Sequence, residues 1–236
     1  TRSDRDWSSD VCSSDLAGLF QNQKEINDWI AAGNGIYQAD VKPGDVKYVD
    51  VNHDGVINAS DKVDLGNGLP KYTFGFNVNL AWKGFDLSAN FTGAAGFQIA
   101  QSYRDPSSSQ ANYSRRILKR WTGEGTSNEI PRVTYGDVGN WLFSDLYLQD
   151  GDYIRLQNLT MGYDFKKLIS WKGLSKMRLY FQVQNLFTLT KYDGMDPEIG
   201  SFNGTDGNSS DSWVSGVDMG YYPHPRTFIV GLNLAF

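Results

Sequence analysis

The residues best suited to chemistry in this 236-residue chain form an oxygen-rich loop between Asp50 and Asp61. Calcium takes about six to eight oxygen ligands from a loop that curls around it, with a glycine at the sharp turn. Gly55 stands at that turn, and Ile57 is placed to anchor the loop to the body of the protein. The spacing predicts a structural Ca²⁺ site. Its expected ligands are Asp50, Asn52, Asp54, the Val56 carbonyl, Asn58 and Asp61.

Two features of this loop depart from the usual calcium-binding pattern. Asp61 occupies the last ligand position, where the longer Glu side chain binds calcium through both oxygens more readily. The flanking segments do not look helical, and residues 43–49 look extended instead. An alternative interpretation is a turn in which Asn and Asp side chains bond to their own backbone.

Aromatic residues outside the expected strands form a second candidate site. Exposed Trp and Tyr rings stack on sugar faces, which predicts contact with a carbohydrate ligand. The same residue types also collect at the interface between a membrane and water, and that alternative remains open. The candidate residues are Trp121, Tyr135, Trp141, Trp213, Tyr221 and Tyr222.

Other functional classes find little support. His53 lies inside the acidic loop and His224 stands between two prolines, and neither is recognisably paired with a nucleophilic Ser or Cys. Cys12 is the single cysteine, so the chain has no disulfide framework and no cysteine-based metal site. A net charge of -5 gives no basic footprint for nucleic acid. We expect no enzymatic activity and no nucleic-acid partner.

The first sixteen residues differ from the rest. They are rich in Ser and Asp, lack periodicity, and resemble a translated sequencing adapter. We expect residues 1–16 to be a non-native, disordered leader that replaces the true start, so that the absence of a signal peptide carries no information. Residues 17–71 are predicted to be an extracellular loop region that carries the calcium-type loop, and residues 72–236 a set of membrane strands.

The strands that must position these loops are recognised by their alternation. From Tyr72 to Ala95 two stretches place apolar residues at every second position, separated by the two-residue turn at Lys83 and Gly84. The segment 225–236 alternates in the same way and ends in Phe236. Each stretch is about as long as a membrane-crossing strand requires, roughly 9–11 residues.

Two further strands are predicted, at residues 152–164 and 177–187. In the first, Ile154 and Leu156 have the opposite parity to Leu159, which a β-bulge would reconcile. Long irregular connections are expected at residues 96–145, with a short helix at Tyr113–Trp121, and at residues 188–222.

The lengths of the connections alternate between short and long. Transmembrane β-barrels have short turns on the periplasmic side and long loops outside, whereas a soluble sandwich has no reason to alternate in this way. A transmembrane helix is excluded, because no run of eighteen apolar residues exists. Five strands are too few to close a barrel. The sequence therefore predicts an all-β fold, an incomplete wall of an antiparallel transmembrane β-barrel with long extracellular loops.

Several ordered segments resemble the C-terminal part of SusC/RagA-type TonB-dependent outer-membrane transporters. The resemblance covers residues 17–236, and the order and spacing of its segments carry it rather than any single motif. The matching segments are Gly18–Phe20 with Glu25 and Ile26, Pro43–Asp45 leading into the Asp50–Asp61 loop, Gly66–Pro70, Gly151–Tyr163, Gln184–Phe187, Lys191–Glu198 and Tyr222–Phe236.

The resemblance implies a barrel of about 22 strands with a plugged lumen, located in the bacterial outer membrane. It implies uptake of bulky nutrients such as oligosaccharides or peptides. The implied partners are a SusD-like surface lipoprotein, the TonB complex acting through a missing N-terminal region, the membrane lipid, and the outer-membrane assembly machinery, which would read Phe236. The alternative is a secreted, calcium-stabilised β-module that binds carbohydrate.

Overall fold

The computed structural model describes residues 12–101, 115–134, 139–140, 142–169, 171–199, 216–218 and 220–236. Within them the chain divides into two compact units. The sheet unit comprises Leu69–Gln98, Asp150–Ile199 and Tyr221–Phe236, and the loop unit comprises the remaining described residues. The first change of unit along the chain falls between Gly68 and Leu69. The described residues of the central connection from Ile99 to Gln149 group with the loop unit.

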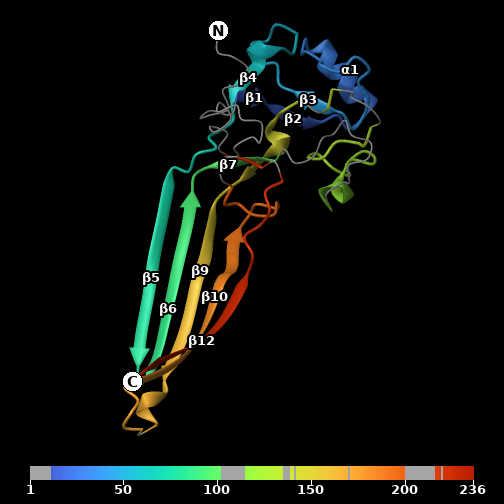
Figure 1. Ribbon diagram of the computed structural model, residues 1–236. Coiled ribbons are helices and arrows are strands. Elements are labelled where there is room, and N and C mark those ends of the chain that lie inside the picture. Colours follow the sequence, from blue (N-terminus) through green and yellow to red (C-terminus); the bar gives the residue numbers. More distant parts are fainter. Residues whose placement is uncertain are drawn as a thin grey trace, which may run out of the picture. The chain divides into compact units, whose positions relative to one another are not determined.

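The sheet unit is built on five long antiparallel strands that follow one another as a meander (Figure 1). Their order across the sheet is β12-β10-β9-β6-β5. Neighbouring strands in space are therefore neighbours along this series, which is the simplest way to join antiparallel strands. The strands are β5 (Tyr72–Trp82), β6 (Phe85–Ala95), β9 (Tyr153–Asp164), β10 (Lys176–Thr190) and β12 (Thr227–Ala235).

The hairpin between β5 and β6 confirms the predicted turn. Trp82 pairs with Phe85, and the two residues between them both adopt positive φ, 47° at Lys83 and 98° at Gly84. Two consecutive positive φ angles give the tight turn whose twist matches that of the flanking strands. The two strands then stay in register over their full lengths, as far as the pair of Tyr72 and Ala95.

The predicted bulge in β9 is also confirmed. Asn90 of β6 pairs with Asn158, but the next residue, Phe91, pairs with Leu156. The extra residue, Gln157, reverses the parity of β9 at this point. Leu156 thereby returns to the face that carries Phe91, and the apolar face continues along the strand.

The loop unit contains short elements around a small core. One helix, α1 (Gln23–Ala31), begins at Asn22, whose side chain accepts a hydrogen bond from the backbone N–H of Glu25. Its strands are β1 (Cys12–Ser14), β2 (Leu16–Leu19), β3 (Val46–Tyr48), β4 (Lys62–Asp64), β7 (Gln98–Gln101), β8 (Leu148–Asp150) and β11 (Val217–Asp218). One residue of β7 and one residue of β8 belong to the sheet unit. Short 3-10 helices cover Ala59–Asp61, Arg115–Lys119 and Asp145–Tyr147, and a fourth, Phe165–Lys167, belongs to the sheet unit.

The short strands pair locally. β2 pairs with β3, β1 pairs with β4, and β7 lies between β11 and β8. Buried side chains of Leu19, Val46, Tyr48 and Ile57 form the core that these pairs enclose. Ile57 thus anchors the acidic loop to the body of the protein, as its position in the sequence predicts.

Three expectations need correction. Cys12–Ser14 is a strand paired with β4, and β2 begins at Leu16, so the last residues of the predicted disordered leader are ordered. The short helix expected at Tyr113–Trp121 is a 3-10 helix limited to Arg115–Lys119 within the described residues. The long connections are less irregular than expected, because they contain β7 and β11. None of the described helices is long and apolar enough to cross a membrane.

Candidate functional site

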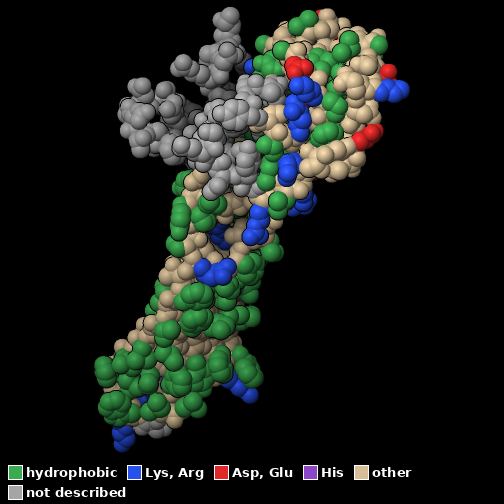
Figure 2. Space-filling model, turned by 90° about the vertical axis from the view of Figure 1, so that its right-hand side faces the viewer, with side chains coloured by type: hydrophobic (Ala, Val, Ile, Leu, Met, Phe, Trp, Pro, Cys, Tyr) green, Lys and Arg blue, Asp and Glu red, His purple; other side chains and the backbone are tan. Residues whose placement is uncertain are grey.

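The outer face of the five-stranded sheet is apolar from one edge to the other. Cross-strand pairing places apolar residues of all five strands in continuous rows. Most of the large side chains are exposed, by 47% to 72% in the last strand alone, whereas Ala89, Leu156 and Val183 are buried. Figure 2 shows hydrophobic side chains gathered over this part of the molecule. One complete row is Leu80, Leu87, Met161, Phe181 and Val230.

An exposed apolar face of this extent is unusual in a protein that is surrounded by water. Soluble monomers rarely expose contiguous apolar patches larger than a few hundred Å², and larger patches mark contact with membranes or partners. Alternation along every strand means that all these residues lie on the same side. The face therefore needs an apolar medium or partner beside it.

The opposite face carries charged and amide side chains. Arg178 on β10 reaches across β9 to Asp86 on β6, and its Nε donates to the Asp86 carboxylate at 2.8 Å. The pair passes over Gly162, where an added Cβ would lie 2.6 Å from Arg178 Nε. The guanidinium also lies 5.0 Å from the centre of the Tyr180 ring. This face suits water and polar contacts, so the two faces of the sheet differ in the way a membrane wall requires.

At the end with the long connections, a buried ion cluster binds two loops to the sheet. Arg155 of β9 is almost fully buried and forms an ion pair with Asp196. Its Nη1 lies 2.9 Å from an oxygen of Glu198, and its Nε donates to the Thr188 hydroxyl at 3.0 Å. A guanidinium with several partners of this kind is strongly oriented. The segment after β10 is thereby held against β9.

Asp196 also binds the segment that precedes β12. The backbone N–H of His224 donates to its carboxylate at 3.1 Å, and Nδ1 of the His224 ring lies 3.0 Å from the same oxygen. Burial raises the pKa of the Asp196 carboxyl, but the N–H groups of Glu198 and His224, the His224 ring and the Arg155 charge outweigh it and hold the pKa below its ordinary value. The carboxylate is ionised in the folded chain.

The acidic loop curls as the sequence predicts. Asp50 accepts hydrogen bonds from the backbone N–H of Asp54, at 3.2 Å, and of Gly55, at 2.7 Å. Gly55 adopts φ of +81°, a conformation that only glycine takes readily. Asp61 accepts from the N–H of Val51 at 3.0 Å and of Asn58 at 2.7 Å. The first and last carboxylates of the loop therefore hold its two ends together.

Asp50 and Asp61 are both buried, and they are the residues best placed to attract a cation. Hydrogen bonds from the N–H of Asn58, and then from those of other loop residues, lower the pKa of the Asp61 carboxyl, and the Asp50 side chain lowers it further. Together they outweigh burial, which raises this pKa. In this conformation the oxygens of Asn52, Asp54 and Asn58 are bonded to the loop itself. Across the described residues no group of three or more His, Cys, Asp or Glu side chains is placed to hold a metal ion.

The oxygen ligands and the length of the loop thus fit Ca²⁺. The hydrogen bonds within the loop also fit the alternative, a turn that is bonded only to itself. A calcium shell would need the two buried carboxylates together with amide oxygens and the Val56 carbonyl. The side chain of Asp54 would have to turn from the N–H of Val56, to which it is bonded at 2.8 Å. Both interpretations therefore remain open.

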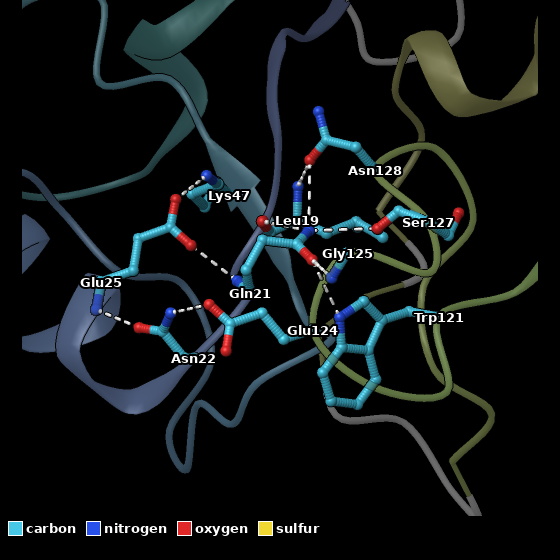
Figure 3. A network of polar contacts seen from close by, with 10 residues as sticks. All are labelled: Leu19, Gln21, Asn22, Glu25, Lys47, Trp121, Glu124, Gly125, Ser127 and Asn128. Carbon is cyan, nitrogen blue, oxygen red and sulfur yellow. Dashed lines mark hydrogen bonds and ion pairs between the residues drawn. The ribbon is translucent and has the colours of Figure 1, made fainter.

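Trp121 lies in a packed environment within the loop unit. It contacts the small core, and the absence of a side chain at Gly44 leaves room for its indole ring. The indole Nε1 donates to the side-chain oxygen of Gln21 at 3.2 Å (Figure 3). This hydrogen bond and the packing fix the ring in place, so Trp121 joins the 115–134 segment to the first strands.

Gln21 is the centre of that polar network (Figure 3). Its side-chain oxygen also accepts from the N–H of Gly125 at 2.9 Å, and its amide nitrogen donates to the Ser127 carbonyl at 3.0 Å. Its own backbone N–H donates to Glu25 at 2.6 Å, and Glu25 pairs with Lys47 at 2.5 Å. The network joins three segments that are distant in the sequence.

The other predicted residues fall in different parts of the chain. Tyr135, Trp141 and Trp213 lie outside the described residues. Tyr221 and Tyr222 are exposed and precede β12 in the sheet unit, whereas Trp121 belongs to the loop unit. Phe236 follows β12 and is exposed, with the last strand pair formed by Lys176 and Ala235.

Sequence reasoning missed the two ion clusters of the sheet. The alternation of the strand implies that Asp86 lies on the polar face but names no partner for it, and nothing in the sequence singles out Arg155 or Arg178. The signal for such an ion pair is a charged residue at a strand position that faces away from the apolar side. Finding the partner requires the register, because Asp86 and Arg178 are separated by 92 positions.

Comparison with known proteins relates the chain to one group of membrane proteins. It is 34% identical over 206 residues to the TonB-dependent receptor P3 of Formosa agariphila, a match that covers 86% of this chain and 20% of that receptor. It is 30% identical over 223 residues to receptor P26 of the same organism, covering 93% of this chain and 22% of that receptor. The chain thus spans about a fifth of the length of these relatives. No model of a known protein family matches it.

More distant matches agree. The TonB-dependent receptor SusC of Bacteroides thetaiotaomicron is 29% identical over 205 residues, covering 85% of this chain and 18% of SusC. The structure of the RagAB peptide transporter superposes with a TM-score of 0.66 at 20% identity, covering 98% of this chain and 24% of the matched chain. At that identity the superposition shows the fold alone.

Proposed function

Because the chain belongs to the SusC/RagA-type TonB-dependent receptors, which are outer-membrane proteins, we propose that its five long strands form part of the lipid-facing wall of such a receptor. The supporting observation is the contrast between the two faces of the sheet. Apolar rows cover one face, while the ion pair of Asp86 and Arg178 lies on the other. A wall between lipid and a wet interior needs that arrangement.

The two outermost strands support the same proposal. In the described residues, neither β5 nor β12 has a further strand on its outer side. Unpaired backbone groups are not tolerated in the hydrocarbon of a bilayer, so these edges require neighbouring strands. The chain spans about a fifth of its relatives, and we assign the missing neighbours to the rest of a closed barrel.

The activity that follows is import of bulky nutrients, oligosaccharides or peptides, with a SusD-like surface lipoprotein and the TonB complex as partners. The long connections carry Tyr221 and Tyr222 as exposed candidates for ligand contact. The test is uptake by cells that express the complete receptor. Uptake that depends on both the receptor and TonB is expected, and uptake that continues without TonB would contradict the proposal.

The membrane wall itself is tested by a pair of substitutions on adjacent residues of β5. Val78→Lys places a charge on the apolar face and should cost about 2–4 kcal/mol near the bilayer midplane. Asn77→Lys places the same charge on the polar face, where the cost should be small. Folding of the complete receptor into lipid vesicles measures both. Equal costs would argue against a lipid-facing wall.

A secreted β-module predicts the same order of cost for the two variants but stability in a different medium. It would bury Phe74, Phe76 and Val78 against a second layer, but these side chains are exposed within the part of the chain that the structure describes. Lysine at position 78 would then be the more damaging change in water as well as in lipid. Stability of the protein in water without detergent would favour that alternative.

For the acidic loop we propose that Ca²⁺ acts as a structural staple. The buried carboxylates of Asp50 and Asp61 support this, because buried charges are normally paired or bind metal ions. Titration calorimetry of the complete receptor with Ca²⁺ should show binding that is lost in Asp61→Ala. Equal heats for the two proteins would leave a self-bonded turn as the explanation.

For the terminal aromatic residue we propose a role in assembly. Phe236 is exposed beyond the last strand, where the outer-membrane assembly machinery would have access to it. Phe236→Ala should reduce the amount of receptor that reaches the membrane while leaving its refolding into detergent unchanged. A loss of refolding in detergent would indicate a role in stability instead.

A further inference from the structure

The apolar face contains a groove close to the short turns. Its volume is about 530 Å³, within the range of about 300–1,000 Å³ that is common for small-molecule sites. The walls are almost wholly apolar. The residues that line it include Leu80, Trp82, Phe85, Met161, Leu179 and Phe181.

Strand register explains where the groove lies. Most of its lining residues belong to the last two apolar cross-strand rows before the short turns, one through Leu80 and Met161 and one through Trp82 and Leu179. The second row contains several aromatic residues. The rings of Phe85 and Tyr163 lie 4.4 Å apart, and the Phe165 ring lies 4.9 Å from that of Tyr163. Aromatic rows of this kind mark the boundary between hydrocarbon and headgroups.

Lysines surround this end of the sheet. Lys83 stands in the turn between β5 and β6, and its Nζ lies 4.8 Å from the centre of the Trp82 ring, which lines the groove. The connection between β9 and β10, residues 165–175, contains three lysines and no Asp or Glu. Figure 2 shows Lys and Arg side chains at the end of the hydrophobic surface. A positive rim therefore borders the apolar groove.

Two cations of the rim have no acidic partner among the residues described. In that part of the chain, Lys83 and Lys172 make no ion pair within 4 Å. Lys176 alternates onto the polar face together with Arg178 and does not belong to the rim. Asp86 is engaged with Arg178, and Asp164 accepts a hydrogen bond from the N–H of Lys166. The cations are thus available to an external anion.

The connection itself presents apolar side chains beside these cations. Leu168, Ile169 and Trp171 are exposed, by 69%, 39% and 61%. Lys166 donates to the Trp171 carbonyl at 2.8 Å, which folds the connection into a compact turn. Apolar side chains interleaved with lysines are typical of segments that lie in a membrane interface.

We propose that this groove binds an anionic phospholipid of the leaflet at the short-turn side, with an acyl chain in the groove and the phosphate between Lys83 and Lys172. Charge complementarity favours this occupant, because lysines near a membrane surface attract anionic headgroups. The long lysine side chains can reach the phosphate while their stems stay along the apolar surface. This inference depends on the proposed lipid-facing wall.

The test uses the complete receptor in nanodiscs that contain equal amounts of phosphatidylglycerol and phosphatidylcholine with identical acyl chains. After transfer to mild detergent, mass spectrometry measures the lipid that stays bound. Retention of phosphatidylglycerol over phosphatidylcholine is expected for the wild type. Replacing Lys83 and Lys172 by Gln should lower that preference by about fivefold or more.

The matched control replaces Lys62 and Lys71, which are exposed lysines that do not line the groove, by Gln. The control should keep the preference. No preference in the wild type, or an equal loss in the control, would overturn the proposal.

A second pair of variants tests the groove independently of charge. Met161→Trp fills the groove, whereas Val78→Trp adds the same bulk to the apolar face outside the lining residues. Retained phosphatidylglycerol should fall only in the first variant, and unchanged retention would overturn the groove as the binding site. Membrane insertion of each variant is measured in parallel. Normal insertion without lipid preference defeats this inference alone, while failed insertion of the wild type defeats the proposed wall.

Discussion

The sheet unit and the loop unit of this chain follow opposite rules for burial. In the loop unit, apolar residues such as Leu19 and Phe20 are inside, together with buried polar residues such as Asp45 and Asn140. In the sheet unit, large apolar residues such as Phe228 and Val230 are mostly exposed. The same chain therefore builds one part that supplies its own core and another that requires an apolar environment.

The difference shows how the surrounding medium replaces a core. The sheet satisfies its backbone through strand pairing, and in the proposed wall its apolar side chains would contact lipid. The loop unit, which is expected to face water, cannot do so. Its short strands and 3-10 helices leave many backbone and side-chain groups to be satisfied by specific polar contacts, such as those of Gln21.

The strongest way to break the loop unit is to remove a buried charge. Asp45 is fully buried, its carboxylate pairs with Arg132 at 2.7 Å, and it accepts a hydrogen bond from Asn140. Asp45→Ala should cost about 3–5 kcal/mol, because it leaves the partner groups unpaired. Hydrogen exchange of residues 17–48 in the complete receptor measures the loss. Asp40→Ala, which removes a solvent-exposed pair with Lys42, should change little.

Within the sheet unit, the corresponding disruption is overpacking of the polar face. Gly162→Ala places a methyl group 2.7 Å from Asp86 Oδ1 and beside Arg178, so the ion pair must move. We expect a cost of about 1–3 kcal/mol in refolding into lipid vesicles. Gly75→Ala is the matched control, since its nearest neighbour would lie at an ordinary 3.4 Å. Similar losses in both variants would show that the ion pair is not the cause.

A smaller effect is expected at the start of α1. Asn22 accepts from the N–H of Glu25 at 2.9 Å, and its amide nitrogen donates to Glu124 at 2.5 Å. Asn22→Ala should destabilise the helix by about 1 kcal/mol. Faster exchange of the first helical amides would reveal it, and Asn27→Ala on the exposed side of the same helix is the control. Slowed exchange in Asn22→Ala would contradict the role of the cap.

The smallest effect at neutral pH is expected from acid titration of Asp196. Its folded pKa lies below the ordinary value of 3.8, so its contribution to stability is complete above that value. The contribution is lost as the pH falls through the folded pKa. Residues 191–199 should therefore exchange faster at about pH 3 than at about pH 7, relative to the intrinsic rates. Asp196→Asn should remove this pH dependence, and its persistence would assign the effect to another group.

The sequence alone predicted most of the sheet unit. Strict alternation in β5, β6 and β12 identifies both the strands and their apolar face, because each side chain's direction follows from its position. The parity change between Leu156 and Leu159 predicted the bulge for the same reason. The curl of the Asp50–Asp61 loop was predicted as well, since its local hydrogen bonds depend only on residues within the loop.

Tertiary structure alone decided the contacts between distant segments. The alternation of side chains does not predict the ion pair of Arg155 with Asp196 or the hydrogen bond of Trp121 with Gln21. These contacts depend on strand register and on the paths of the long connections. The groove beside Lys83 likewise exists only where five strands align their last two rows. Side-chain direction is a local property of the chain, whereas partnership is a property of the assembled sheet and loops.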